Sequence, residues 1–220
     1  AHDLTGLNFE YPVGISIAST NTHFDSDQEQ IMDIVKGFLV FENSRVNHSY
    51  YELNISCPNT FGGEPFTSPD RLEQLLTVTD SLQLSKPMYI KMPIDQSEKE
   101  TLQLLAVADE HNVQGVIFGN LTKDKNNPDV TPEDKKTWKS RKGNLSGQPT
   151  FARSNALIKL TRDNFYDRFT IVGCGGIFDT KTAQAKLDAG ADLLQMITGM
   201  VFNGPQVMGT INRELDLKNK

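Results

Sequence analysis

The sequence lacks several features that would assign it to common classes of protein. Its 220 residues contain no apolar run of about 18 residues, which is the length that a membrane-spanning helix needs. The first residues show neither the basic nor the apolar segment of a secretory signal. Two cysteines, Cys57 and Cys174, are too few for a disulfide framework and are typical of a reducing compartment. These absences favour a cytoplasmic protein.

Charge and short motifs exclude further classes. The formal net charge is −6, which gives no electrostatic reason to expect a nucleic-acid partner. The four histidines share no metal-ligand spacing with one another or with the cysteines, so the sequence predicts no metal site. Walker, Gly-x-Ser-x-Gly and Gly-x-Gly-x-x-Gly motifs are also missing. Charged residues make up 23% of the chain, an ordinary value that argues against wholesale disorder.

What the chain does contain is an alternation of short apolar runs and segments of helical period. The runs predict strands over 11–17, 50–56, 87–92, 115–119, 169–173 and 192–197. The periodic segments predict helices over 28–43, 69–84, 97–111, 154–164 and 180–189. Such alternation predicts a single α/β domain over 1–220, built on a parallel sheet covered by helices. An open doubly wound sheet fits this pattern, but glycines after the last two strands favour a (β/α)8 barrel.

The two glycine clusters are the first candidate binding site. Gly-Cys-Gly-Gly-Ile at 173–177 follows the fifth predicted strand, and Ile-Thr-Gly at 197–199 follows the sixth. In barrels, the loops after the last two strands often bind phosphate through backbone N–H groups. Glycine permits the close approach that this needs. The alternative is that these glycines only end their strands.

A polar cluster at 54–60, Asn-Ile-Ser-Cys-Pro-Asn-Thr, ends the second predicted strand. The strand period places Asn54 and Ser56 on one face, and Cys57 at the strand end, where barrels hold catalytic groups. The amides of Asn54 and Asn59 suit a flat ligand with imide or carboxylate groups. A partly ionised Cys57 can accept a proton, the ordinary thiol pKa being about 8.5. The alternative is a buried structural cysteine beside a turn.

Three further candidates lie in the middle of the chain. Lys91 interrupts an apolar strand, and because lysine is rarely buried unless paired, it predicts a buried negative charge such as a phosphate or reduced cofactor. The alternative is a lysine that reaches solvent at the strand end. Asn120 directly follows the fourth predicted strand. The link over 120–150 is long enough to be functional or disordered, and its segment 143–147, Gly-Asn-Leu-Ser-Gly, is either a lid over a ligand or a solvated turn.

Taken together, these segments resemble the dihydroorotate dehydrogenase family. The match includes the clusters above, Pro-Val-Gly-Ile-Ser-Ile at 12–17, Ile-Lys-Met-Pro at 90–93 and Gln-Met-Ile-Thr-Gly at 195–199. The resemblance implies a (β/α)8 barrel that binds FMN and oxidises dihydroorotate to orotate in pyrimidine biosynthesis. It also implies that Cys57 removes the proton from C5 of the substrate, while hydride passes from C6 to the flavin N5.

The resemblance assigns roles residue by residue. It places Asn54, Asn59 and Asn120 at the substrate and Lys91 beside the pyrimidine edge of the flavin, where its charge would stabilise the reduced anion. The residues that it places at FMN are Ser16, Asn54, Lys91, Ser146, Gly147, Gly175, Gly176, Ile197, Thr198 and Gly199.

Some positions depart from the family pattern. Cys57 resembles the soluble class 1 enzymes and favours a soluble electron acceptor, whereas the segment 143–147 resembles the quinone-using class 2. Fumarate, NAD through an iron–sulfur partner, and quinone all stay open as acceptors, and a homodimer is possible. Leu121 replaces a Ser or Thr that usually bonds the substrate. Another dihydropyrimidine substrate, or a non-catalytic phosphate-ligand-binding barrel, therefore stays an alternative.

The length is the last departure. The six predicted strands correspond to the third to eighth strands of the family barrel, so we expect an N-terminally incomplete barrel with about six βα units.

Overall fold

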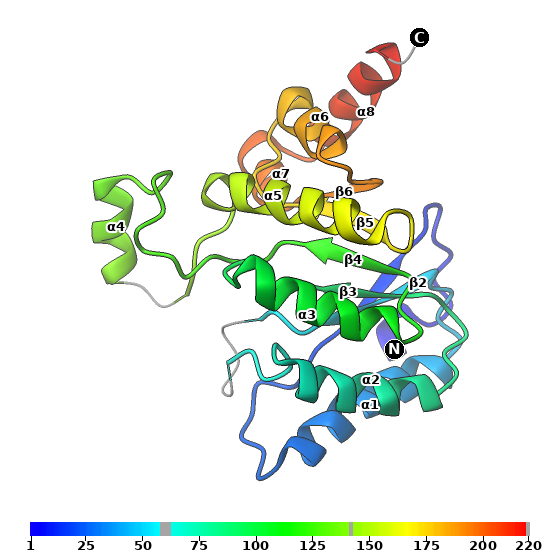
Figure 1. The fold of residues 1–220 in the computed structure, drawn as a ribbon. Helices are drawn as coiled ribbons and strands as arrows, with labels where there is room; N and C mark the ends of the chain where they lie inside the picture. Colours follow the sequence, from blue (N-terminus) through cyan, green and yellow to red (C-terminus); the bar gives the residue numbers. More distant parts are fainter. Residues whose placement is uncertain (58–62, 141–142, 219–220) are drawn as a thin grey trace. The chain divides into compact units, whose positions relative to one another are not determined.

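The computed structural model describes residues 1–57, 63–140 and 143–218 of the chain (Figure 1). Its strands are β1 (Gly14–Ile17), β2 (Tyr50–Asn54), β3 (Met88–Lys91), β4 (Gly115–Phe118), β5 (Thr170–Cys174) and β6 (Leu193–Gln195). Its helices are η1 (His2–Leu4), α1 (Asp27–Glu42), α2 (Pro69–Ser81), α3 (Glu98–Asp109), α4 (Pro132–Lys139), α5 (Gln148–Phe165), α6 (Thr180–Asp188), α7 (Thr198–Asn203) and α8 (Gln206–Lys218).

The strands follow one another in the sheet in chain order, β1-β2-β3-β4-β5-β6, with helices between them. The pairs β1–β2, β2–β3 and β5–β6 are parallel. This confirms the predicted α/β class and the succession of six βα units. By its internal contacts the chain divides into two compact units. Unit 1 comprises residues 1–91 and 99–116, and unit 2 comprises residues 92–98 and 117–220.

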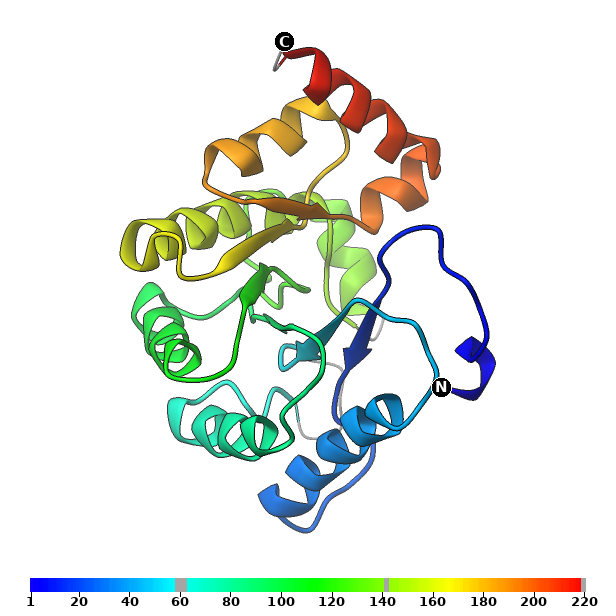
Figure 2. The ribbon, with the colours of Figure 1, turned by 90° about the vertical axis from the view of Figure 1, so that its right-hand side faces the viewer.

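In unit 1, α1 lies against β1 and beside α2 (Figure 2), and the strands bury apolar side chains such as Ile15, Leu53 and Ile90. Ser26 caps α1 by accepting a hydrogen bond from the backbone N–H of Glu29 at 3.2 Å, which satisfies one of the free donors of the first turn. About three turns later the buried Phe38 packs edge-on against Tyr51 of β2, with 5.2 Å between ring centroids. Because strand side chains alternate, the neighbours of Tyr51 on β2 point to the opposite face, which carries the polar residues.

In unit 2, α5 lies against β5, and α6 packs beside α8 (Figures 1 and 2). A capping box starts α6: Asp179 accepts from the backbone of Thr182, and the Thr182 hydroxyl accepts from the backbone of Asp179. The small core between α6 and α8 contains Ile177, Ala183 and Ile211. The capping box and this small apolar core therefore hold the helices that follow β5 and β6 in place.

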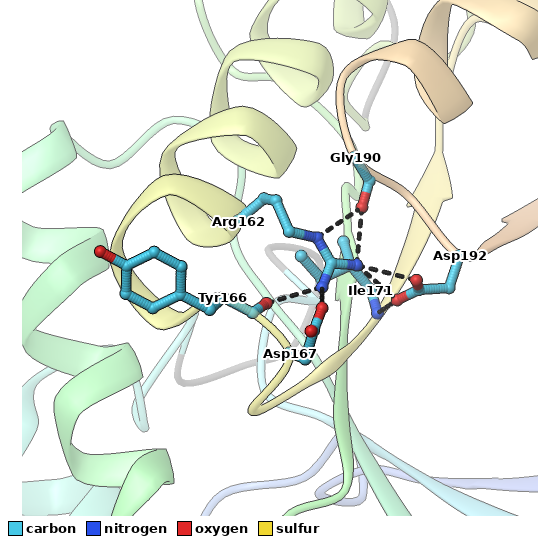
Figure 3. A network of polar contacts seen from close by, with 6 residues as sticks. All are labelled: Arg162, Tyr166, Asp167, Ile171, Gly190 and Asp192. Atoms are coloured by element: carbon cyan, nitrogen blue, oxygen red, sulfur yellow. Dashed lines mark hydrogen bonds and ion pairs between the residues drawn. The ribbon is translucent and has the colours of Figure 1, made fainter.

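Arg162, near the end of α5, ties together the amino ends of β5 and β6 (Figure 3). Its guanidinium donates to both carboxylate oxygens of Asp192 at 2.8 Å and to the carbonyl of Gly190 at 2.9 and 3.1 Å. Asp192 in turn accepts from the backbone N–H of Ile171 at 2.7 Å. Because functional groups of βα folds gather at the carboxyl ends of strands, a network at the amino ends serves stability.

The structure differs from the predicted elements mainly in the second half of the chain. The link 120–150 contains α4, capped by Thr131, and α5 begins at Gln148 rather than at residue 154. Residues 198–218 form α7 and α8, where no helix was predicted. Five strands are shorter than their apolar runs, whereas β5 has the predicted length and lies one residue later in the chain. Among the described residues, no helix is both long and apolar enough to cross a membrane.

Candidate functional site

The polar face of β1–β3 in unit 1 carries a buried, charged cluster. Parallel pairing aligns Ser16 with Glu52 and Asn54 with Lys91. The hydroxyl of Ser16 donates to Glu52 Oε1 at 2.8 Å, and Lys91 Nζ lies 4.0 Å from the same oxygen. The side chains of Lys91 and Glu52 are only 16% and 8% exposed. We call Ser16, Glu52, Asn54 and Lys91 the charged strand cluster.

The contacts within the charged strand cluster show where the side chain of Lys91 points. Its ammonium is largely buried and faces a carboxylate, so it does not extend to solvent at the strand end. A buried negative charge was predicted to face Lys91, but it was not predicted that Glu52 supplies one within the chain. The signal was available in the alternation of Tyr-Tyr-Glu-Leu-Asn at 50–54, which puts Glu52 and Asn54 on the same face.

Asn54 ends β2 and starts the turn that leads to Cys57. Its Oδ1 accepts from both the backbone N–H and the hydroxyl of Ser56, each at 3.2 Å, a local bond that competes with the strand ladder. The predicted strand therefore stops at Asn54 instead of continuing to Ser56. Cys57 lies three residues beyond the strand, is half-buried and takes part in no disulfide. Asn59, predicted to bind substrate, lies outside the described residues.

Two tyrosines share the polar face with the charged strand cluster. The rings of Tyr50 and Tyr89 meet edge to face, with 5.6 Å between centroids. Burial raises the pKa of Tyr50, and the charge of Glu52 adds to the rise, so Tyr50 stays protonated at neutral pH. Unit 1 thus presents an ammonium, a carboxylate and an amide on its polar strand face, with a protonated phenol at the amino end of β2.

Unit 2 brings two predicted cofactor segments together. The hydroxyls of Ser146 and Thr198 are 2.9 Å apart, although 52 residues separate them. Gly147 has a φ of +80°, and a Cβ there would lie 2.8 Å from Cγ2 of Thr198. The segment 143–147 is therefore not a free solvated turn, because its end packs on the start of α7.

The glycines after β5 and β6 allow the backbone to pack closely. Gly175 and Gly176 have φ values of +95° and +72°, and a Cβ on Gly175 would lie 2.3 Å from Oγ1 of Thr150. A Cβ on Gly199 would lie 2.0 Å from the carbonyl oxygen of Ile177. These glycines do more than end strands, since no other residue fits this packing. We call Ser146, Gly147, Gly175, Gly176 and 197–199 the glycine cluster.

The glycine cluster has the donor chemistry of an anion site. The first N–H groups of a helix have no partner within it, and α7 starts at Thr198 in this cluster. The hydroxyls of Ser146 and Thr198 stand beside that start. The side chain of Ile197 is 65% exposed, so only its backbone takes part in the packing. A phosphate group suits backbone amides and hydroxyls of this kind.

Asn120 joins the same unit through the start of the long link. Thr122 and Leu145 form an antiparallel bridge, with N···O distances of 2.8 and 3.1 Å, which brings the residues after Asn120 beside the segment 143–147. Asp95 anchors the link by accepting from the Thr122 hydroxyl at 2.7 Å and from the Lys123 backbone at 2.6 Å. This role of Asp95 was not predicted from the sequence. The bridge and the bonds to Asp95 hold residues 122–123 and 145 of the link in defined positions beside one another.

The strand order and the polar groups after the strands define the chain as a protein of the βα-barrel class, and comparison with known proteins narrows this class. The sequence profile of the family described as "Dihydroorotate dehydrogenase" matches residues 7–218. The chain therefore belongs to the dihydroorotate dehydrogenase family.

Two curated relatives are each named "Dihydroorotate dehydrogenase (quinone)". The protein of Rippkaea orientalis is 31% identical over 213 residues, which cover 95% of this chain and 55% of that protein. The protein of Brucella ovis is 30% identical over 214 residues, covering 92% and 55%. The chain thus spans about half the length of the curated relatives it matches.

Solved structures agree on the fold. The DHODH of Eimeria tenella in complex with ferulenol aligns with a TM-score of 0.79 at 24% identity, covering 97% of this chain and 59% of that one. The ligand-free DHODH from the same organism aligns with a TM-score of 0.77 at 23% identity, covering 92% and 58%.

Proposed function

We propose that this chain carries the reaction centre of an FMN-dependent dihydroorotate dehydrogenase, an oxidoreductase that converts dihydroorotate to orotate. The observation that carries the proposal is the charged strand cluster of unit 1, with Cys57, which is not in a disulfide, three residues beyond β2. Membership of the family and the names of the curated relatives support it.

In this proposal Cys57 is the general base that takes the C5 proton of dihydroorotate. A thiol beyond the carboxyl end of a strand is where βα-barrels hold such groups, and a base poised near neutral pH contributes about 10²- to 10⁴-fold. The amides of Asn54, Asn59 and Asn120 would hold the ring carbonyl, N–H and carboxylate groups of the substrate. Leu121 offers no hydroxyl; its backbone N–H instead donates to Asn120 Oδ1 at 3.0 Å, which orients that amide.

FMN fits the residues that the chain provides. The glycine cluster supplies backbone N–H groups and two hydroxyls for the phosphate. Lys91 supplies a buried positive charge, and Ser16 a hydroxyl, toward the polar edge of a flavin ring. When bound, FMN supplies the two-electron acceptor for the substrate. Lys91 would stabilise the negative charge that follows, and its pairing with Glu52 keeps it oriented before substrate arrives.

We further propose quinone as the final electron acceptor. The names of the curated relatives support it. Cys57, which resembles the soluble class, favours fumarate or NAD as the alternative. Anaerobic reoxidation of the reduced full-length protein separates them: we expect rapid return of the flavin absorbance with a short-chain quinone and slow return with fumarate or NAD. Rapid return with fumarate alone would overturn this part of the proposal.

The central test is flavin reduction in the full-length natural protein. We expect a yellow protein whose flavin bands bleach when dihydroorotate is added without oxygen. A yellow protein that bleaches only with another dihydropyrimidine would redirect the proposal to that substrate, as Leu121 allows. A colourless protein that cannot take up FMN would favour a non-catalytic phosphate-binding role instead.

A further inference from the structure

Lys186 is a fully buried lysine whose hydrogen-bond partners are neutral. It lies on α6 in unit 2, its side chain is 0% exposed, and the proposed function gives it no role. Its Nζ donates to Ser154 Oγ at 2.8 Å and to Asn155 Oδ1 at 3.0 Å, both on α5. The Phe151 ring centroid lies 5.1 Å from Nζ. A buried ammonium is expensive without a carboxylate, so its retention calls for an explanation.

The partner Ser154 connects Lys186 to two strands. Ser154 is fully buried, and its hydroxyl is directed at the carbonyl oxygens of Phe118 at 3.0 Å and Cys174 at 2.7 Å. These are the last residues of β4 and β5. The backbone N–H of Gly119 also donates to Cys174 at 3.1 Å. The chain continues from these two points into Asn120 and into the glycine cluster.

The charge of Lys186 determines what the Ser154 hydroxyl does. A hydroxyl has one hydrogen, and an ammonium can only donate, so Ser154 must accept from Lys186 and direct its own hydrogen at the strand-end carbonyls. A neutral amine has a lone pair. Ser154 can then rotate its hydrogen toward Nζ, and the two carbonyls lose their shared donor.

We propose that Lys186 is a positioning residue, whose protonated amine holds Ser154 against the carboxyl ends of β4 and β5 and so fixes the backbone of the two loops that follow them. Loss of the proton releases both strand ends together. This role concerns the chain itself and does not depend on the identity of the substrate or cofactor.

The surroundings of Lys186 lower its pKa into the pH range in which the protein can be studied. Burial lowers the pKa of Lys186 to about 8, and the negative charge of a Cys174 thiolate acts in the opposite direction. The partners on α5 do not titrate, so Cys174 on β5 is the titratable neighbour among these contacts. The stem of Lys186 packs on β5, since a Cβ at Gly173 would lie 3.0 Å from its Cδ.

The test follows the backbone amides of Gly119 and Gly175 by NMR across pH 6–10 in the full-length protein, with its cofactor if it retains one. We expect both amide signals to shift with one common midpoint near 8, as burial of Lys186 implies. Lys186→Met keeps the length of the side chain and should abolish the common shift. Lys181→Met, on the exposed side of the same helix, and Cys174→Ser should both preserve it.

Several outcomes would overturn the proposal. They are a wild-type protein whose two amides do not titrate together, a midpoint that survives Lys186→Met, or one that disappears in Cys174→Ser. If Lys186→Met does not fold, Ser154→Ala provides the second variant: the amides should stop responding to pH while Lys186 remains. Because the readout is a backbone shift, failure here leaves the dehydrogenase proposal intact, and failure of that proposal leaves this one testable.

Discussion

The two units place different chemistry after their strands. Unit 1 uses side chains: Glu52 and Lys91 are buried charges on neighbouring strands, and the thiol of Cys57 follows β2. Unit 2 uses backbone: Gly175 and Gly199 have no side chain, and the polar groups beside them are hydroxyls and amides. Side chains can move protons and carry charge, whereas a backbone cradle can only bind. We therefore expect substitutions in unit 1 to change the reaction and those in unit 2 to change retention of an anion.

The largest effect should come from Cys57→Ala in unit 1. Loss of a general base costs about 10²- to 10⁴-fold, so flavin reduction by dihydroorotate should slow by about 10³-fold while flavin content stays unchanged. Rapid-mixing absorbance measures the rate, and the bound flavin is counted after denaturation. Cys57→Ser, which puts a hydroxyl in place of the thiol, should slow the step less. Equal reduction rates in the wild type and Cys57→Ala would remove Cys57 from the mechanism.

The next effect tests whether the pair of buried charges acts as a unit. Lys91→Met leaves the buried Glu52 carboxylate without its positively charged neighbour, which should lower the free energy of unfolding by about 2–3 kcal/mol. Adding Glu52→Gln removes the unpaired charge and should restore about half of that loss. Denaturant unfolding of both single variants and the double variant gives the coupling energy. Additive losses would mean that the 4.0 Å contact carries no interaction.

In unit 2, Gly175→Ala should weaken anion retention without slowing the proton transfer. The new Cβ would lie 2.3 Å from Thr150 Oγ1 at a φ of +95°, so the loop must shift, at about 1–3 kcal/mol. We expect FMN affinity to fall by about tenfold, measured by ultrafiltration. Gly209→Ala on α8, where a Cβ meets nothing within 4 Å, is the matched control and should retain FMN fully. A slower reduction step in fully loaded Gly175→Ala would contradict the contrast between the units.

The two clusters also differ in how far the sequence predicts them. Lys91 and the glycines were identified because each is unusual in its local setting, a charge in an apolar strand or glycines at successive strand ends. Glu52 was missed because its partners depend on strand register, which pairs it with residues 36 and 39 positions away. Lys186 was missed because the sequence of α6 does not indicate which of its polar residues is buried. The helix α7 has only six residues, too few for a helical period to show, whereas the sequence of α8 carries a clear apolar stripe that was overlooked.

The helix boundaries were likewise predicted well only where the local signal was recognised. The helices α1 and α2 were predicted to within a few residues, because an apolar stripe with a Ser or Pro start is a local signal. The start of α5 was predicted at residue 154, six residues late, because Gly147 and Pro149 were taken for part of a loop. Proline at the first turn of a helix is a start signal, and here it was the informative one.

The smallest effect concerns His111 in unit 1, away from both clusters. Its ring nitrogens lie 2.8 Å from Asp80 and 3.0 Å from Glu73. Burial lowers the pKa of His111, but the hydrogen bonds to the two carboxylates outweigh it, so the folded pKa is raised. A raised folded pKa stabilises the protein fully below the ordinary value of about 6.5, and this is lost as pH rises through the folded pKa.

We therefore expect His111→Gln to lower the free energy of unfolding at pH 5–6, and less so as pH rises above the folded pKa. The difference should stay below about 1 kcal/mol, because Glu73 is half exposed and water screens the pair. Urea unfolding at several pH values measures it, with His2→Gln, at a fully exposed residue, as the matched control. Flavin reduction should be unchanged, because His111 belongs to neither cluster. A loss that grows with pH would show that neutral His111, and not the charged pair, supports unit 1.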